Sequence, residues 1–307
     1  MVLVTGARGF LGGFVLRHYV RAGWDVIGLG RDAAPGAEPV PASVAWHAGE
    51  VTLETLTSLG LRPDLIVHCA GSGSVPGSFS DPAGDLRDTV HSTAAVLEFV
   101  RQHCPGCVVV YPSSAAVYGN AAGAPVDEDS PVSIHAPGSP YGTHKLMAEQ
   151  LCLSYGRHFG LSVAIVRLFS IYGEGLRKQL LWDACQKIER GDHVYGGTGG
   201  ECRDWMHAED AARLLAAVAP YAEPECPIFN GASGEPTTVR DVLNLLYREL
   251  GVHAAPRFSQ RARPGDPTSL QADTSRALAI GWTPSIDLEH GIARYARWYG
   301  QALRQAV

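Results

Sequence analysis

Two side chains one helical turn apart are suited to proton transfer. Tyr141 and Lys145 are four residues apart in a segment whose pattern predicts a helix, so they share one helix face. A phenol has a pKa near 10 and is a poor acid or base at neutral pH. A neighbouring ammonium stabilises the phenolate, and a phenol pKa lowered by roughly two to three units would make Tyr141 a competent proton donor or acceptor.

A pair of serines precedes this helix. Ser113 and Ser114 follow an apolar run at 108–111, and open α/β sheets place their ligands at the carboxyl ends of such strands. A serine hydroxyl at that place can hold a substrate oxygen beside the phenol. Serine, tyrosine and lysine in this order predict proton transfer to or from an oxygen of the substrate.

Three glycines follow the first apolar run at a constant spacing. Gly6 lets the chain turn off the strand, Gly9 lets the backbone approach a pyrophosphate, and Gly12 lets the next helix pack closely on the sheet. The N-terminus of that helix offers N–H donors and a partial positive charge to phosphates. The context predicts a dinucleotide site. The other loop residues assigned to this cofactor are Arg8, Phe10 and Leu11.

The end of the second strand bears on which dinucleotide is bound. An NAD site normally carries an acid there, but Gly30 occupies that position and Arg31 follows. Arg31 and Arg8 suit a 2′-phosphate, because a guanidinium binds it bidentately, and this favours NADP(H). Alternatively, Arg31 is a solvated surface residue and Asp32 serves NAD(H). Glu50, after the third strand, is expected to border the adenine.

Short apolar runs alternate with helical patterns through the first 168 residues. The runs are rich in Val and Ile and mostly continuous, as in strands buried on both faces. The alternation predicts an α/β fold with a Rossmann-type doubly wound parallel sheet. Strands are expected at 2–4, 25–29, 44–47, 65–68, 108–111 and 162–167, and helices at 10–22, 53–59, 86–104 and 141–159.

The second half of the chain lacks this regular alternation of strands and helices. Helices are expected at 180–190, 208–219, 239–250 and 288–303, with Gly/Pro-rich loops between them. We therefore divide the 307 residues into a dinucleotide-binding Rossmann domain at 1–168 and a smaller C-terminal substrate-binding lobe at 169–307. A segment near 208–232 is expected to return to the first domain.

The composition excludes several classes of protein. With 46% hydrophobic and 18% charged residues, the chain is expected to be globular rather than disordered. The net charge of −6, without a basic run, argues against nucleic acid or an anionic membrane as the main partner. No secretion signal or membrane-inserting stretch is evident, so a cytoplasmic location is expected.

The seven cysteines are odd in number and scattered, unlike a disulfide framework. Cys104 and Cys107 are expected to be two thiols in a helix-to-strand turn, since a redox pair would open a helix and a zinc site would need a second pair. No metal site is expected.

Together these motifs resemble the extended short-chain dehydrogenase/reductase family, which comprises nucleotide-sugar epimerases, dehydratases and reductases. The resemblance covers essentially the whole chain and is further supported by residues 68–71, 113–119, 139–142, 167–173, 203–207 and 263–266. It implies hydride transfer between a nicotinamide and a sugar carbon, with Tyr141 as acid/base and Lys145 on the nicotinamide ribose. Aligning residues 117–119 with the family pattern makes Ser114, not Ser113, the catalytic hydroxyl.

The resemblance also implies a nucleoside-diphosphate sugar as substrate. Arg203 and Arg263 match positions that grip the diphosphate, and Asp266 matches one near the nucleoside ribose. Ser170 stands where epimerases commonly have Asn, and Ala70 is assigned to the cofactor. A homodimer through the two long helices at 86–104 and 141–159 is implied as well.

Two activities remain open on the same catalytic residues. The first, favoured by Gly30 and Arg31, is an NADPH-dependent 4-ketoreductase in which Tyr141 protonates the forming alkoxide. The second is a nucleotide-sugar C4 epimerase, which oxidises the sugar transiently and returns the hydride to its other face. A non-catalytic dinucleotide sensor is a third reading, against which the intact catalytic set argues. Dehydration is disfavoured because Ala115 and Ala116 stand where 4,6-dehydratases carry an acidic pair.

Overall fold

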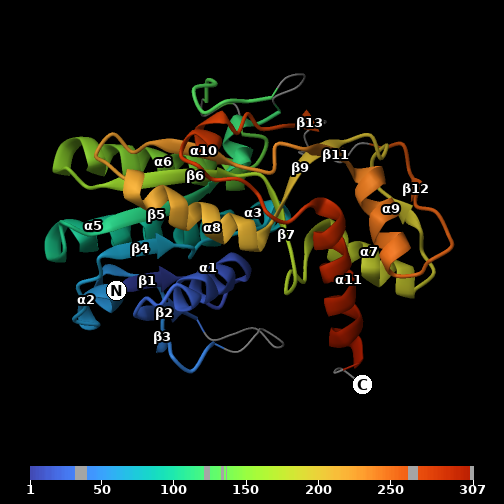
Figure 1. Cartoon of the computed structure of the whole chain (residues 1–307). Helices are drawn as coiled ribbons and strands as arrows, with labels where there is room; N and C mark the ends of the chain where they lie inside the picture. Colours follow the sequence, from blue (N-terminus) through green and yellow to red (C-terminus); the bar gives the residue numbers. More distant parts are fainter. Residues whose placement is uncertain (32–39, 121–124, 133–134, 136, 262–268, 305–307) are drawn as a thin grey trace.

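A parallel sheet of seven strands forms the centre of the molecule (Figure 1). The computed structural model describes residues 1–307 except 32–39, 121–124, 133–134, 136, 262–268 and 305–307. The strand order β3-β2-β1-β4-β5-β6 is that of a Rossmann sheet, with β10 added beside β6. The expected doubly wound α/β fold is confirmed. The strands are β1 (Val2–Thr5), β2 (Val26–Gly30), β3 (Ala45–Ala48), β4 (Leu65–His68), β5 (Val108–Ser114), β6 (Val163–Leu168) and β10 (Ile228–Gly231).

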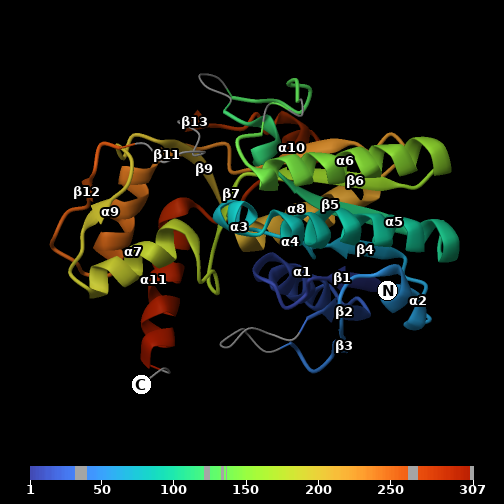
Figure 2. The ribbon, with the colours of Figure 1, turned by 180° about the vertical axis from the view of Figure 1, so that it is seen from behind.

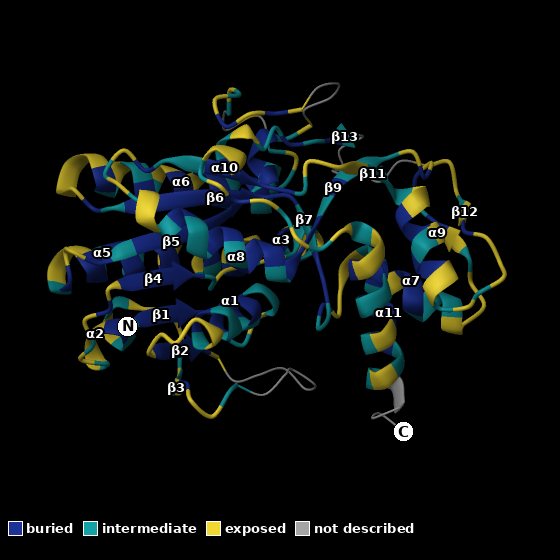
Figure 3. Ribbon diagram, viewed as in Figure 1, coloured by how far each residue is buried: buried dark blue, intermediate teal, exposed yellow. Residues whose placement is uncertain are grey.

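Helices cover both faces of this sheet (Figures 1 and 2). Successive side chains of β1 point to opposite faces, so Val2 and Val4 belong to one apolar core and Leu3 to the other. One face is covered by α1 (Phe10–Arg21) and α8 (Ala208–Val218). The other is covered by α2 (Leu53–Ser58), α5 (Ser92–His103) and α6 (Pro140–Phe159). Strands β1, β2, β4 and β6 are consequently buried along their whole length, whereas the edge strand β3 has no buried residue (Figure 3).

The segment before α5 differs from the expected single helix. It contains α3 (Val75–Ser80), α4 (Pro82–Leu86) and a π-helical turn (Arg87–His91) that leads into α5. Ser74 and Asp81 cap the two short helices, and each helix has a proline in its first turn, where the missing N–H is harmless.

The lobe surrounds a second, smaller sheet made of β7 (Ser170–Tyr172), β9 (Cys202–His207), β11 (Pro236–Thr238) and β13 (Ser269–Leu270). Its helices α7 (Gln179–Glu189), α9 (Val239–Glu249) and α11 (Leu288–Arg304) agree with the expected ranges to within one residue at each end. The remaining elements are β8 (Val194–Tyr195), β12 (Arg257–Phe258), α10 (Ser275–Ala279) and two 3-10 turns (Ala115–Tyr118, Ala219–Tyr221). Sequence patterns missed the lobe strands because most span only two or three residues.

A buried ion pair fastens α6 to the sheet. Glu149 of α6 is fully buried, and both of its carboxylate oxygens accept hydrogen bonds from Arg167 of β6, at 3.1 and 2.9 Å. Ser113 of β5 donates a third bond to the same carboxylate, at 2.5 Å. Two-pronged geometry with an added donor is what makes a charge pair tolerable inside a protein.

We expect Glu149→Gln to destabilise the protein by about 3–5 kcal/mol, because it leaves the Arg167 guanidinium buried without a counter-charge. Urea denaturation measures this loss. Glu289→Gln is the matched control: its carboxylate pairs with Arg248 on the surface and is expected to contribute less than about 1 kcal/mol. Equal effects of the two substitutions would contradict the role given to Glu149.

Candidate active site

The glycine loop is folded tightly against the segment after β4. Gly6 has a φ of +62°, and a Cβ at this position would lie 2.6 Å from the Ala70 nitrogen. A Cβ at Gly12 would lie 2.2 Å from the Gly6 carbonyl oxygen. Helix α1 starts after Gly9, and no side chain of the described residues caps it. The loop and the uncapped helix end form a backbone cradle that fits a dinucleotide pyrophosphate.

The end of β2 is shaped by Trp46, a residue that the sequence analysis did not single out. A Cβ at Gly30 would lie 3.3 Å from the indole of Trp46, so a packing contact explains the absence of a side chain there. The Arg8 guanidinium stacks 4.2 Å from the same ring, and exposed Arg31 pairs with Asp88 at 3.2 Å. Both arginines therefore have protein partners, and the missing acid is not by itself a sign of a 2′-phosphate.

Two other acidic residues were expected near the cofactor. Glu50 is exposed and lies two residues after the end of β3. The segment runs next to the end of β2, since Gly49 donates its N–H to the Gly30 carbonyl. Asp32, the alternative partner for an adenosine ribose, lies outside the described residues.

A histidine at the end of β4 holds the next part of the cradle. The His68 ring is buried and lies 2.7 Å from the Thr5 hydroxyl and 3.3 Å from the Ser92 hydroxyl. Burial, aided by the charge of Lys145, lowers the pKa of His68 to about 3, so its ring is neutral at physiological pH. The Thr5 oxygen also accepts the Ala70 N–H at 3.2 Å. This chain of contacts fixes the backbone against which the glycine loop packs.

Ser114 and Tyr141 meet where α6 begins. A Cβ at Gly142 would lie 2.7 Å from the Ala116 carbonyl oxygen, so α6 packs directly on the turn that follows β5. Ser139 caps the helix by accepting the Gly142 N–H. The Ser114 hydroxyl lies close enough to the Tyr141 phenol to lower the pKa of the phenol through hydrogen bonding.

The pKa of Tyr141 differs from the sequence expectation. Burial raises it above the usual phenol value, and the bond with Ser114 only partly opposes this. Burial also lowers the pKa of Lys145 to about 8. Its ammonium donates to the Pro112 carbonyl at 2.9 Å and lies 4.9 Å from the Tyr111 ring. The protein alone thus does not supply the lowered phenol pKa that we expected, because desolvation outweighs the opposing effect of Ser114.

The two serines have different surroundings. Ser113 points to the buried carboxylate of Glu149, whereas the Ser114 oxygen accepts the Ala116 N–H at 3.2 Å on the Tyr141 side. Alternation along β5 therefore places only Ser114 beside the phenol. This supports the choice of Ser114 over Ser113.

Sequence reasoning missed a carboxylate next to the phenol. Asp85 of α4 is buried, and one of its oxygens lies 2.5 Å from Nδ1 of His144, three residues after Tyr141 in α6. Its other oxygen has no hydrogen-bond partner among the described residues. The Asp85 charge raises the pKa of Tyr141 further. The sequence could not show this contact, because Asp85 lies more than fifty residues before the helix that it contacts.

The residues assigned to the substrate are only partly described. Ser170 begins β7, and Arg203 of β9 donates to the Cys202 carbonyl at 2.8 Å. The neighbouring Asp204 is buried and accepts hydrogen bonds from the N–H and hydroxyl of Ser233. Arg263 and Asp266 lie outside the described residues.

Two further features concern metals and membranes. Within the described ranges, no three His, Cys, Asp or Glu side chains gather as metal ligands would, and no helix has the length and apolar character needed to cross a bilayer. Cys104 ends α5 and Cys107 precedes β5, both as free thiols in a helix-to-strand turn.

A Rossmann sheet with a glycine cradle at β1 and a Ser-Tyr-Lys set at β5 defines a dinucleotide-dependent enzyme of the extended short-chain dehydrogenase/reductase type. The model of the NAD dependent epimerase/dehydratase family matches residues 2–230, and the chain belongs to that family. The resemblance found in the sequence is thereby confirmed.

Relatives match along the whole chain. The UDP-glucose 4-epimerase of Azospirillum brasilense is 31% identical over 336 residues, which cover 100% of this chain and 93% of the relative. The crystal structure of a UDP-glucose 4-epimerase from Thermotoga maritima with UDP-glucose has a TM-score of 0.89 at 23% identity, covering 98% of this chain and 99% of the other. MoeE5 in complex with UDP-glucose and NAD has a TM-score of 0.86 at 28% identity, with the same coverage.

The close contact at Gly12 gives a test of the cradle. Gly12→Ala places a methyl group against the Gly6 carbonyl and should weaken dinucleotide binding more than about tenfold, because the loop must shift. Gly13→Ala is the control, since its methyl group would meet the flexible end of Arg17 at 3.4 Å and the Ala7 carbonyl oxygen at an ordinary contact distance of 3.8 Å. Fluorescence titration with NADH measures both. Equal affinities of the two variants would refute the cradle.

Proposed function

We propose that this protein is an NAD-dependent nucleotide-sugar C4 epimerase acting on a UDP-sugar. The observation that carries the proposal is the full-length similarity to the UDP-glucose 4-epimerase of A. brasilense, combined with Ser114, Tyr141 and Lys145 at one strand end. The epimerase alternative is therefore favoured over the 4-ketoreductase, which was our first expectation. The preference for NADP(H) has no support from the relatives, whose family is described as NAD-dependent.

The glycine loop and Ala70 would hold the dinucleotide, with Lys145 at the nicotinamide ribose. When bound, the nicotinamide supplies a hydride acceptor and donor for the sugar C4 carbon. Tyr141 takes the proton of the 4-hydroxyl as the sugar is oxidised. It returns a proton to the same oxygen after the keto sugar has rotated to present its other face to the hydride. Ser114 donates a hydrogen bond to the same oxygen. Because the half-buried phenol has a raised pKa, Tyr141 depends on the positive charges of Lys145 and the oxidised cofactor to lose its proton.

The substrate roles of Ser170, Arg203, Arg263 and Asp266 remain part of this proposal, as does a homodimer through α5 and α6. Two apolar residues of α5, Leu97 and Val100, are fully buried inside the protomer. A partner would instead meet the outward face of α6, where Met147 is 41% exposed.

Incubation with UDP-glucose and NAD tests the activity. Proton NMR is expected to detect UDP-galactose while the nicotinamide absorbance stays constant. A sustained consumption of NADPH with a 4-keto sugar would favour the reductase. Tight dinucleotide binding without change in several UDP-sugars, UDP-glucuronate included, would favour the sensor.

Three substitutions separate chemistry from structure. Tyr141→Phe and Ser114→Ala are expected to reduce turnover, the former by roughly 100- to 10,000-fold, without lowering the melting temperature. Ser113→Ala removes a bond to buried Glu149 and should cost about 1–2 kcal/mol of stability while leaving turnover nearly intact. Turnover and thermal melting are measured on all three. If Ser113→Ala reduced turnover and Ser114→Ala did not, the catalytic hydroxyl would be that of Ser113, and our assignment would be wrong.

Cofactor choice has its own test. Arg31 is exposed and paired with Asp88, so Arg31→Ala should change the affinity for NAD(H) less than about threefold. Titrations of both dinucleotides are compared between wild type and variant. A wild-type preference for NADP(H) that disappears in Arg31→Ala would restore the 2′-phosphate site.

A further inference from the structure

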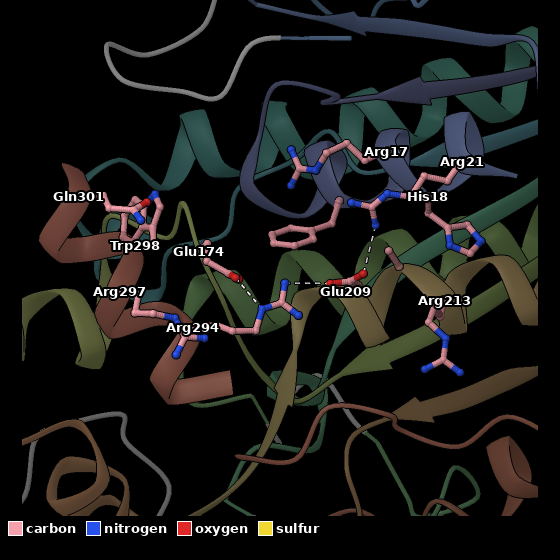
Figure 4. A pocket seen from close by; sticks show the side chains of 12 residues that line it. Arg17, His18, Arg21, Glu174, Glu209, Arg213, Arg294, Arg297, Trp298 and Gln301 are labelled. Atoms are coloured by element: carbon pink, nitrogen blue, oxygen red, sulfur yellow. Dashed lines mark hydrogen bonds and ion pairs between the residues drawn. The ribbon is translucent and has the colours of Figure 1, made fainter. Parts of the chain in front are cut away.

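A pocket of about 530 Å³ opens between α1, α8 and α11 (Figure 4). The part of α1 that lines it is the part toward the C-terminus of that helix. Its volume is in the range of small-molecule sites. No residue assigned above to the cofactor, the catalytic set or the sugar nucleotide lines it. It is lined by Phe14, Arg17, His18, Arg21, Glu174, Glu209, Ala212, Arg213, Arg294, Arg297, Trp298 and Gln301.

Cationic side chains dominate this pocket. Five arginines line it, against two glutamates. Figure 4 shows Arg17 and Arg21 extending from α1, and Arg294 and Arg297 from α11. Within the part of the chain that the structure describes, no acid pairs with Arg297.

The acids present are already shared among several cations. Glu209 pairs with Arg21 at 3.1 Å and with Arg294 at 2.9 Å. Glu174 pairs with Arg294 at 2.7 Å and with buried His207. The lining of the pocket therefore carries more arginines than acids.

A histidine in the pocket responds to this charge. The pKa of His18 is lowered by burial and then by Arg213 and Arg21, while Glu209 opposes them. Arg213 is itself paired with Asp210 behind the pocket. Even with these acids in place, the surroundings of His18 disfavour a further positive charge.

We propose that this pocket binds a small polyanion carrying two or more phosphate groups, contacted by arginines of α1 on one side and of α11 on the other. Guanidinium groups suit phosphate oxygens because they donate two parallel hydrogen bonds. A single phosphate would leave most of the volume empty. The ligand would bridge the dinucleotide domain and the lobe, and its binding would stabilise their contact.

Calorimetric titration with tripolyphosphate tests the site. The protein is first saturated with NAD and UDP, so that the cradle and the proposed sugar-nucleotide cleft are filled. One further binding event is expected, and its affinity should fall severalfold as salt is raised from about 50 to about 200 mM. Arg17→Ala combined with Arg297→Ala should weaken it by at least about tenfold.

Arg157→Ala is the matched control, because Arg157 is an exposed arginine of α6 on the other face of the sheet. It should change the affinity less than about twofold. A parallel titration with ATP distinguishes a nucleotide ligand, which would bind more tightly than tripolyphosphate, from a free polyphosphate. In NMR titrations, the His18 pKa is expected to rise when the anion binds, because the anion offsets the arginine charges.

Absence of the extra binding event in low salt would overturn the proposal. So would equal binding by wild type and the double variant at unchanged melting temperatures. Either result is independent of the epimerase assay, which reports on the cleft at β5 and not on this pocket.

Discussion

The attachment of helix α6 to the central sheet is the constraint on which the active site depends. Glu149 lies on the same helix face as Lys145 and Tyr141, at successive four-residue steps, and its buried ion pair with Arg167 fixes that face toward β5 and β6. The hydrogen bond from Ser113 to the same carboxylate also fixes the position of β5 relative to this helix. A charge pair inside a protein is stabilising only in good geometry, so these contacts tolerate little displacement of the helix.

The same packing sets the electrostatics of the site. Because α6 seals the end of β5, Tyr141 and Lys145 are both desolvated, which raises the pKa of the phenol and lowers that of the ammonium to about 8. His68 is held neutral by the same burial. A phenolate is therefore favoured only when positive charge is brought beside it. In the proposed mechanism, proton transfer by Tyr141 therefore requires an occupied cofactor site.

The sequence predicted what depends on local pattern and could not predict what depends on distant contacts. Continuous Val/Ile runs gave the sheet strands, and the step of four gave Tyr141 and Lys145 on one face of α6. Trp46, in contrast, lies on Gly30 only because β2 and β3 pair, and this contact removes the argument that had favoured NADP(H). The Asp85–His144 contact was equally invisible, since α4 and α6 meet only in the folded chain.

The central claim is that one site removes the hydrogen from C4 of a UDP-sugar and returns it to the opposite face. UDP-glucose deuterated at C4 tests this most directly. The account predicts UDP-galactose that retains deuterium at C4, with a slower rate than the unlabelled sugar and no label lost to solvent or to added NADH. Product that carries hydrogen at C4, or inversion without any isotope effect, would contradict it.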